Sequence, residues 1–386
     1  MEPENQPSTP ETAPVLQGLD EEHWPDSPPP SAPDEYRGLR WAFIGPGGLR
    51  AGWSVPLFTV LVILFSWLVE SAFSRAHLVS RKAGFTATAA LFSELVPFLA
   101  MLGAGAIVAR IERRRIRDYN LTGPHRLPRF FEGLAAGFLA LSALVGTLAW
   151  GHWLRIGPVA LSGAEIVKFG VLWGCAFLLV GCVEEGMFRC YLQFTLTRGI
   201  NFWWALGVEG LICVVLLLTG KGNGVWGVYG MAMLGVAPCW LLHQTRAQSS
   251  SFWQAAWVSS TLFGYIHTGN AGENWIGIFA AAAIGFVFCV SVWVTGSAWW
   301  AIGCHAAWDW AETFFFGTAD SGNVASGHFL TTSPTGAALW SGGTDGPEGS
   351  LLVLPVILLL LVALILMYRR RGAALPVASA RGEGAA

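Results

Sequence analysis

Long apolar runs recur along most of this 386-residue chain, and they constrain its fold more than any other feature. A helix needs about 20 residues to cross the hydrocarbon layer of a membrane. The sequence therefore predicts an all-α fold, a polytopic transmembrane helical bundle with about 8–10 spans, because runs of this length exclude a β-barrel. The ten runs lie near 52–73, 87–109, 131–150, 166–189, 202–218, 225–243, 252–267, 275–294, 299–316 and 351–368.

The composition agrees with a membrane protein. Hydrophobic residues make up 53% of the chain and charged residues only 12%, whereas a soluble domain averages about 25% charged residues. A water-soluble fold could not cover so much apolar surface. We therefore exclude a soluble enzyme, expect the lipid bilayer as the surroundings, and expect no nucleic-acid partner.

Composition also divides the chain into regions. The first is rich in acidic residues and Pro and contains no Lys or Arg, so it cannot bury enough apolar surface to order itself. The predicted regions are a disordered tail at 1–36, transmembrane helices with a basic cytoplasmic loop at 37–160, a helical core at 161–316 with an inserted helical pair near 202–243, a Gly/Ser-rich loop at 317–350, and a last transmembrane helix with a basic tail at 351–386.

The basic residues predict how the chain is oriented. With ten spans and the N-terminus inside, 17 of the 23 Lys and Arg residues fall on the inner side. Cytoplasmic loops carry such an excess, so we expect both termini in the cytoplasm. The Ala-, Gly- and Trp-rich composition suggests a bacterial protein of the cell (inner) membrane.

Three clusters of ionisable residues interrupt the apolar runs, where such groups normally face a cavity or a partner. The first is Glu184-Glu185-Gly-Met-Phe-Arg189. Glu185 and Arg189 are four residues apart and can pair on one helix face, while Glu184 points about 100° away. This arrangement leaves one carboxylate free to act as a general base. Alternatively, the motif merely ends a helix at the membrane surface.

The second cluster is Phe263-Gly-Tyr-Ile-His267, and the third is His305-Ala-Ala-Trp-Asp309. In each, the first and last residues share a helix face, so Asp309 can orient or charge the His305 imidazole. The alternatives are an interfacial histidine and a buried polar pair that joins two helices. Together the clusters offer carboxylates and two imidazoles, which can activate a water and stabilise an oxyanion. They could also bind zinc through Glu184, His267 and His305.

In this order, the motifs EExxxR, FxxxH and HxxxD resemble the CAAX protease and bacteriocin-processing (CPBP, or Abi) family of intramembrane proteases, which includes CAAX prenyl protease 2. The resemblance covers about residues 165–316. It implies a glutamic-type endopeptidase in which Glu184 activates the attacking water and His267 helps to hold it. His305 would sit at the oxyanion with Asp309 beside it, and Glu185, Arg189 and Phe263 would support them. It implies no catalytic metal; a zinc-dependent protease is the alternative.

Two features depart from the family pattern. The 82 residues between Glu184 and His267 exceed the family's usual separation, which suggests an inserted helical pair. Asp309 stands where several members have Asn, and an ionised Asp would repel an oxyanion. The site also closes only if the fourth helix continues past Arg189 towards Arg198, so that Glu184 lies near mid-helix.

We therefore expect an intramembrane endopeptidase that cleaves a membrane-bound protein or peptide in a polar cavity on the cytoplasmic side. The competing hypotheses are a catalytically silent membrane scaffold or sorting factor and a proton-coupled transporter. Glu312, two turns from His305, is expected to line the same cavity. Glu70, Glu94 and Glu209 are interpreted as polar helix contacts or interfacial residues. The sequence does not specify the substrate or the oligomeric state.

Overall fold

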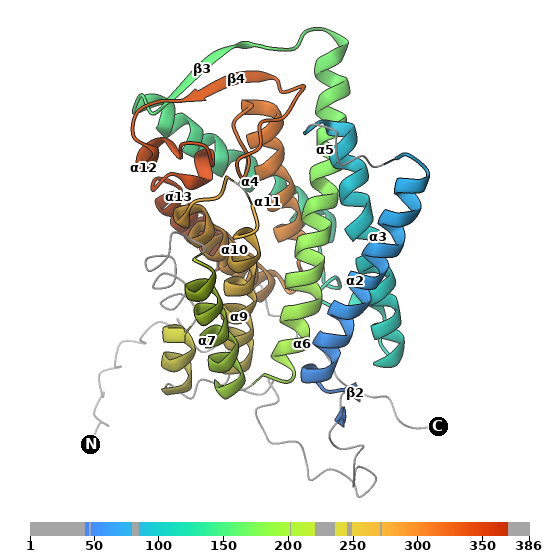
Figure 1. Cartoon of the computed structure of the whole chain (residues 1–386). Coiled ribbons are helices and arrows are strands. Elements are labelled where there is room, and N and C mark those ends of the chain that lie inside the picture. Colours follow the sequence, from blue (N-terminus) through green and yellow to red (C-terminus); the bar gives the residue numbers. More distant parts are fainter. Residues whose placement is uncertain are drawn as a thin grey trace, which may run out of the picture.

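The computed structural model describes residues 43–45, 48–78, 85–200, 202–220, 236–244, 249–270 and 272–369. These residues form a bundle of helices that run back and forth between two ends (Figure 1). The predicted all-α class is confirmed. The main helices are α2 (Ala51–Arg75), α3 (Ala87–Ile111), α4 (Arg126–Trp150), α5 (Ala164–Glu185), α7 (Phe202–Thr219), α9 (Ser250–His267), α10 (Trp275–Thr295), α11 (Trp299–Trp310) and α13 (Val353–Arg369).

Six helices in the described part are long and apolar enough to cross a membrane: α2, α3, α4, α5 with its continuation, α7 and α10. The runs at 252–267, 299–316 and 351–368 are also helical but shorter, and α11 is buried along almost its whole length. The predicted tail at 1–36 and most of the predicted span at 225–243 lie outside the described residues. Of that span, a helix at 236–244 is described.

Glycines let α11 lie at the centre of the bundle. A Cβ on Gly133 or Gly137 of α4 would collide with the α11 backbone, and a Cβ on Gly303 would collide with α4 in return. On the other side of α11, a Cβ on Gly181 of α5 would lie 3.0 Å from the carbonyl oxygen of Ile302. Small residues of this kind bring helix backbones together in membranes. They place α11 between α4 and α5.

Helix α5 continues well beyond Glu185. It runs through the π-helical segment η3 (Gly186–Leu192) and α6 (Gln193–Thr197), which gives one 34-residue helix, Ala164–Thr197. This confirms the expectation that the helix passes Arg189 and places Glu184 near its middle. A second π-helical segment, η4 (Ala311–Phe316), extends α11. Such segments are rare and are often found at functional sites.

The predicted Gly/Ser-rich loop at 317–350 is largely ordered. It contains β4 (Leu330–Pro334), α12 (Ala338–Ser341) and the 3-10 turn η5 (Pro347–Gly349). Strand β4 pairs antiparallel with β3 (Leu154–Val159), which follows α4, and the pair covers one end of the bundle (Figure 1). A second antiparallel pair joins β1 (Ile44–Gly45) to β2 (Gly48–Leu49).

The opposite end of the bundle carries the arginine-rich connection between α3 and α4, which includes the 3-10 turn η2 (Ile116–Asp118). The buried carboxylate of Glu112 anchors it. Ser54 donates a 2.6 Å hydrogen bond to Glu112, the Tyr119 hydroxyl donates one of 3.2 Å, and Arg198 forms an ion pair at 3.2 Å. One carboxylate therefore ties the start of α2, the basic connection and the end of the long helix together.

Candidate active site

The centre of the site is the buried pair of Glu185 and Arg189. Both side chains are fully buried, and Arg189 Nη1 lies 3.2 Å from Glu185 Oε1. This is the pair that the i,i+4 spacing predicts. A buried charge left without its partner is very costly in free energy, so the two groups must stay together.

Arg189 is enclosed by aromatic rings. Its guanidinium carbon lies 4.3 Å from the centre of the Phe263 ring and 5.2 Å from that of Phe288, a cation–π arrangement. Across from it, Gly285 of α10 leaves the space that the guanidinium fills, because a Cβ there would meet Nη2. Phe263 therefore supports the site by covering Arg189.

Glu185 also orients His305. The Glu185 Oε1 atom lies 2.9 Å from His305 Nδ1, and because an ionised carboxylate can only accept, Nδ1 donates. The sequence predicted that Asp309 lies beside this ring, and it does: on the side opposite Glu185, Asp309 Oδ2 lies 3.5 Å from Nε2. No sequence spacing links residues 185 and 305, which are 120 apart, so this contact comes from helix packing.

Glu184 is placed differently from its neighbour. Its side chain is 26% exposed, and its Oε2 lies 3.6 Å from His305 Nε2. That oxygen has no hydrogen-bond partner among the described residues. Because Glu185 forms the ion pair with Arg189, Glu184 is the carboxylate that remains available to a water molecule.

His267 closes the site from the end of α9. Its Nδ1 lies 2.8 Å from the carbonyl oxygen of Phe263, which can only accept, so Nδ1 carries the proton. In the neutral ring, Nε2 is then the acceptor and can receive a hydrogen bond from water. The next residues, Thr268 and Gly269, end the helix in turns.

The motif residues line one cavity of about 220 Å³. A cavity needs only about 10–15 Å³ of such volume to hold one water, so this one has room for several waters. Glu184, His267, His305 and Asp309 all reach this space, and Phe263 forms part of its wall. All three sequence motifs therefore meet.

The cavity also contains polar residues that the sequence analysis did not select. Glu94 of α3, interpreted above as a helix contact, lines it, as do Asn270, Asp320 and Glu348. Glu312, which was expected to line it, is not among its lining residues and is fully buried beside it. For Glu94, the one sequence signal of a place in the cavity was an isolated carboxylate within an apolar run.

The cavity lies towards the end of the bundle that carries the 317–350 segment. Its lining includes residues 85, 270, 320, 321, 323 and 348, all from connections at that end, and none from the described part of the arginine-rich connection 112–125. The sequence predicted that the arginine-rich side is cytoplasmic and that the cavity opens to the cytoplasm. These two predictions cannot both hold.

The zinc alternative can be tested against the same geometry. In the described ranges, only Glu312, Asp320 and Glu348 form a group of three His, Cys, Asp or Glu side chains close enough to share one ion. Glu184, His267 and His305 do not form such a group. Nδ1 of each histidine is engaged, by Phe263 and Glu185 respectively, so only Nε2 of each ring would be open to a metal. As they are arranged, the ligand atoms of Glu184, His267 and His305 are not close enough together to share one ion.

Comparison with protein families matches residues 166–250 and 239–311 to the family model of the type II CAAX prenyl endopeptidase, Rce1-like. This match supports membership of the CAAX protease (CPBP) family. The family implies a membrane-embedded endopeptidase, a hydrolase that acts on a membrane-associated peptide substrate. The two matched segments contain all three motifs, the whole of α9, α10 and α11, and all but the first two residues of α5. Comparisons with curated proteins and with solved structures gave no match.

Proposed function

We propose that this chain is a glutamic-type intramembrane endopeptidase in which Glu184 is the general base. The observation that carries the proposal is the unequal placement of two adjacent carboxylates. Glu185 is fully buried and held by Arg189, whereas Glu184 faces the cavity with one oxygen free of hydrogen bonds from the described residues. A general base needs a free carboxylate within reach of the water from which it removes a proton.

The reaction would proceed by addition of water. Glu184 takes a proton from a water that His267 Nε2 helps to hold, and the hydroxide adds to the carbonyl carbon of the peptide bond. His305 Nε2 faces the same space and, with the ring protonated on both nitrogens as an imidazolium, would donate to the developing oxyanion. As the C–N bond breaks, Glu184 returns the proton to the leaving amine. No step requires a metal.

Glu185 and Asp309 would act as positioning residues. The Glu185 carboxylate fixes the ring of His305 through Nδ1, so Nε2 is presented to the cavity. Asp309 lies 3.5 Å from that nitrogen. An ionised Asp close to an oxyanion would repel it, so we assign Asp309 the role of holding the imidazole rather than of contacting substrate.

We also propose that the arginine-rich end faces the cytoplasm, in agreement with the distribution of Lys and Arg. The cavity, which lies towards the other end, would then receive the substrate peptide from the outer side of the membrane. This replaces the earlier expectation of a cytoplasmic opening. Single-cysteine labelling tests it: a membrane-impermeant maleimide added to intact cells should label Ser321→Cys and not Arg115→Cys. The reverse pattern would place the cavity on the cytoplasmic side.

Catalysis is tested with purified protein in liposomes and a library of membrane-anchored peptides. Glu184→Gln and His267→Ala should abolish cleavage and leave insertion and folding unchanged. Glu165→Gln, an exposed carboxylate in the first turn of α5, is the matched control and should cleave as the unmodified protein does. Full cleavage by Glu184→Gln would refute the mechanism, and normal cellular function of that variant would favour the scaffold hypothesis.

A further inference from the structure

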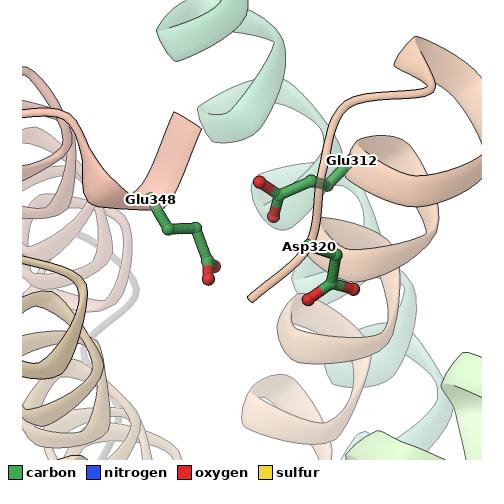
Figure 2. Close-up of side chains that lie close together, drawn as sticks. All are labelled: Glu312, Asp320 and Glu348. Atoms are coloured by element: carbon green, nitrogen blue, oxygen red, sulfur yellow. The ribbon is translucent and has the colours of Figure 1, made fainter. Parts of the chain in front are cut away.

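Beside the catalytic cavity lies a second group of carboxylates that the proposed reaction does not use. Glu312 comes from η4, Asp320 from the connection after it, and Glu348 from η5. Figure 2 shows the three side chains pointing towards a common space between these elements. Residues 36 positions apart in the sequence are thus brought together where the 317–350 segment folds over the end of α11.

The three carboxylates are close enough together to share one divalent cation. One carboxylate oxygen from each residue lies within 4.8 Å of the others. Oxygens on opposite sides of Ca²⁺ are about 4.6–5.2 Å apart, since each Ca–O bond is about 2.3–2.6 Å long. Mg²⁺ demands a nearly ideal octahedron and usually keeps several of its waters, so a group of protein carboxylates favours Ca²⁺.

Two buried carboxylates in this region have oxygens without a hydrogen-bond partner among the described residues. Glu312 is fully buried, and neither of its oxygens has a hydrogen-bond partner in the described part of the chain. Asp345, only 1% exposed and close enough to interact electrostatically with Glu312, likewise has an unpartnered oxygen, Oδ1. Buried charges in proteins are normally paired or coordinate metals.

Within the described residues, no Lys or Arg neutralises the group. The 317–350 segment contains no Lys or Arg, and no ion pair with Lys or Arg reaches these carboxylates within the described ranges. Glu273, at the start of α10, adds a further negative charge nearby. Such an accumulation of like charge is unfavourable unless a bound cation balances it or protons neutralise it.

Neighbouring donors hold two of the carboxylates in place. The Trp308 indole donates a 2.7 Å hydrogen bond to Glu348 Oε1, and the Thr313 hydroxyl donates one of 2.8 Å to Asp320 Oδ2. Such outer contacts orient metal ligands. Asp320 and Glu348 also line the cavity and are partly exposed, so an ion has a path to the site.

We propose that Glu312, Asp320 and Glu348 bind one calcium ion, which ties the 317–350 segment to α11 at the rim of the catalytic cavity. The ion would be structural, because none of its three ligands belongs to the motifs around Glu184. This proposal does not rest on the proposed proteolysis. If the proposal is right, the segment 317–350 at the rim of the cavity is well ordered only when calcium is bound.

Calcium binding is measured with the full-length protein in detergent after removal of divalent cations with a chelator. Calorimetric titration with CaCl₂ should give one ion per chain, with a dissociation constant on the order of 0.1–1 mM for a site of few ligands. Asp320→Asn should weaken binding at least tenfold, and Glu165→Gln should not. Unchanged binding by Asp320→Asn, or no binding by the unmodified protein, would overturn the proposal.

The melting temperature gives a second test, which remains informative even if a variant is less stable than the unmodified protein. Without calcium, Glu312→Gln should raise the melting temperature, because it removes an unbalanced buried charge. With saturating calcium it should melt below the unmodified protein, because only the latter gains from the ion. Hydrogen exchange of residues 318–349 should slow at least threefold when calcium is added to the unmodified protein and not to the variant. The same order of melting temperatures with and without calcium would overturn the proposal.

Discussion

The two adjacent carboxylates of α5 should respond differently to substitution by Gln: Glu185→Gln should lower stability, and Glu184→Gln should lower cleavage. Glu185→Gln keeps the shape of the side chain and an oxygen that can accept from His305 Nδ1. It removes the charge that balances Arg189, which is fully buried and has no other ion pair in the described chain. Breaking one partner of a buried pair costs about 3–5 kcal/mol. The free energy of unfolding should therefore fall by about that amount.

Glu184→Gln should behave differently because its side chain is partly exposed and unpaired with arginine. We expect stability within about 0.5 kcal/mol of the unmodified protein, as for a substitution outside a buried network. Cleavage, in contrast, should fall by about 10²–10⁴, the contribution of a general base. The assay is reversible denaturation in mixed micelles, followed by circular dichroism, beside peptide cleavage.

A double variant isolates the pair. Glu185→Gln combined with Arg189→Met leaves no buried charge, so it should be more stable than Glu185→Gln alone by at least about 1 kcal/mol. If Glu185→Gln were as stable as the unmodified protein, or if the double variant were no more stable than the single one, the account of the buried pair would be refuted.

Other predictions follow from the same geometry. Gly285→Ala should displace the Arg189 guanidinium and cost about 1–3 kcal/mol of stability by overpacking; Gly207→Ala, which has open space around it, should not destabilise, and denaturation of both variants decides the point. Burial and the neighbouring Glu273 raise the pKa of Asp345 to about 8 from its ordinary value of 3.8. Between pH 4 and 8 the folded state then holds a proton that the unfolded state releases, so chelator-treated protein should lose stability as pH rises. A melting temperature that rises over this range, or one whose slope is unchanged in Asp345→Asn, would contradict this. Elemental analysis of active protein should find no stoichiometric zinc, and a cleavage activity that needs added zinc would favour the metalloprotease.

The sequence predicted most of what depends on local spacing. Apolar runs gave the helices, and i,i+4 spacing gave the pair of Glu185 and Arg189 and the proximity of His305 to Asp309. The need for Glu184 to reach the other motifs predicted the long continuous helix, which the structure confirms. Each of these follows from helix geometry within one segment, or from the requirement that three segments meet.

Contacts between distant segments could not be predicted in this way. The hydrogen bond from His305 to Glu185 depends on how closely α5 and α11 pack. Gly181 allows this close approach, and no spacing in the sequence indicates which two helices it brings together. Glu94 reaches the cavity because of the direction in which α3 faces. Glu312, two turns from His305, was expected in the cavity, but η4 is π-helical and the 317–350 segment folds over it. The sequence marked that segment as a loop because its short strand and turns carry no long periodic pattern.

The central claim is that a carboxylate on α5 drives peptide hydrolysis inside this cavity. The most direct measurement compares the membrane proteome of cells that produce the unmodified protein with that of cells that produce Glu184→Gln at equal level, by sequencing protein termini. The account predicts at least one membrane-associated precursor that remains uncut only with the variant. Identical termini in both, for every membrane protein detected, would contradict it.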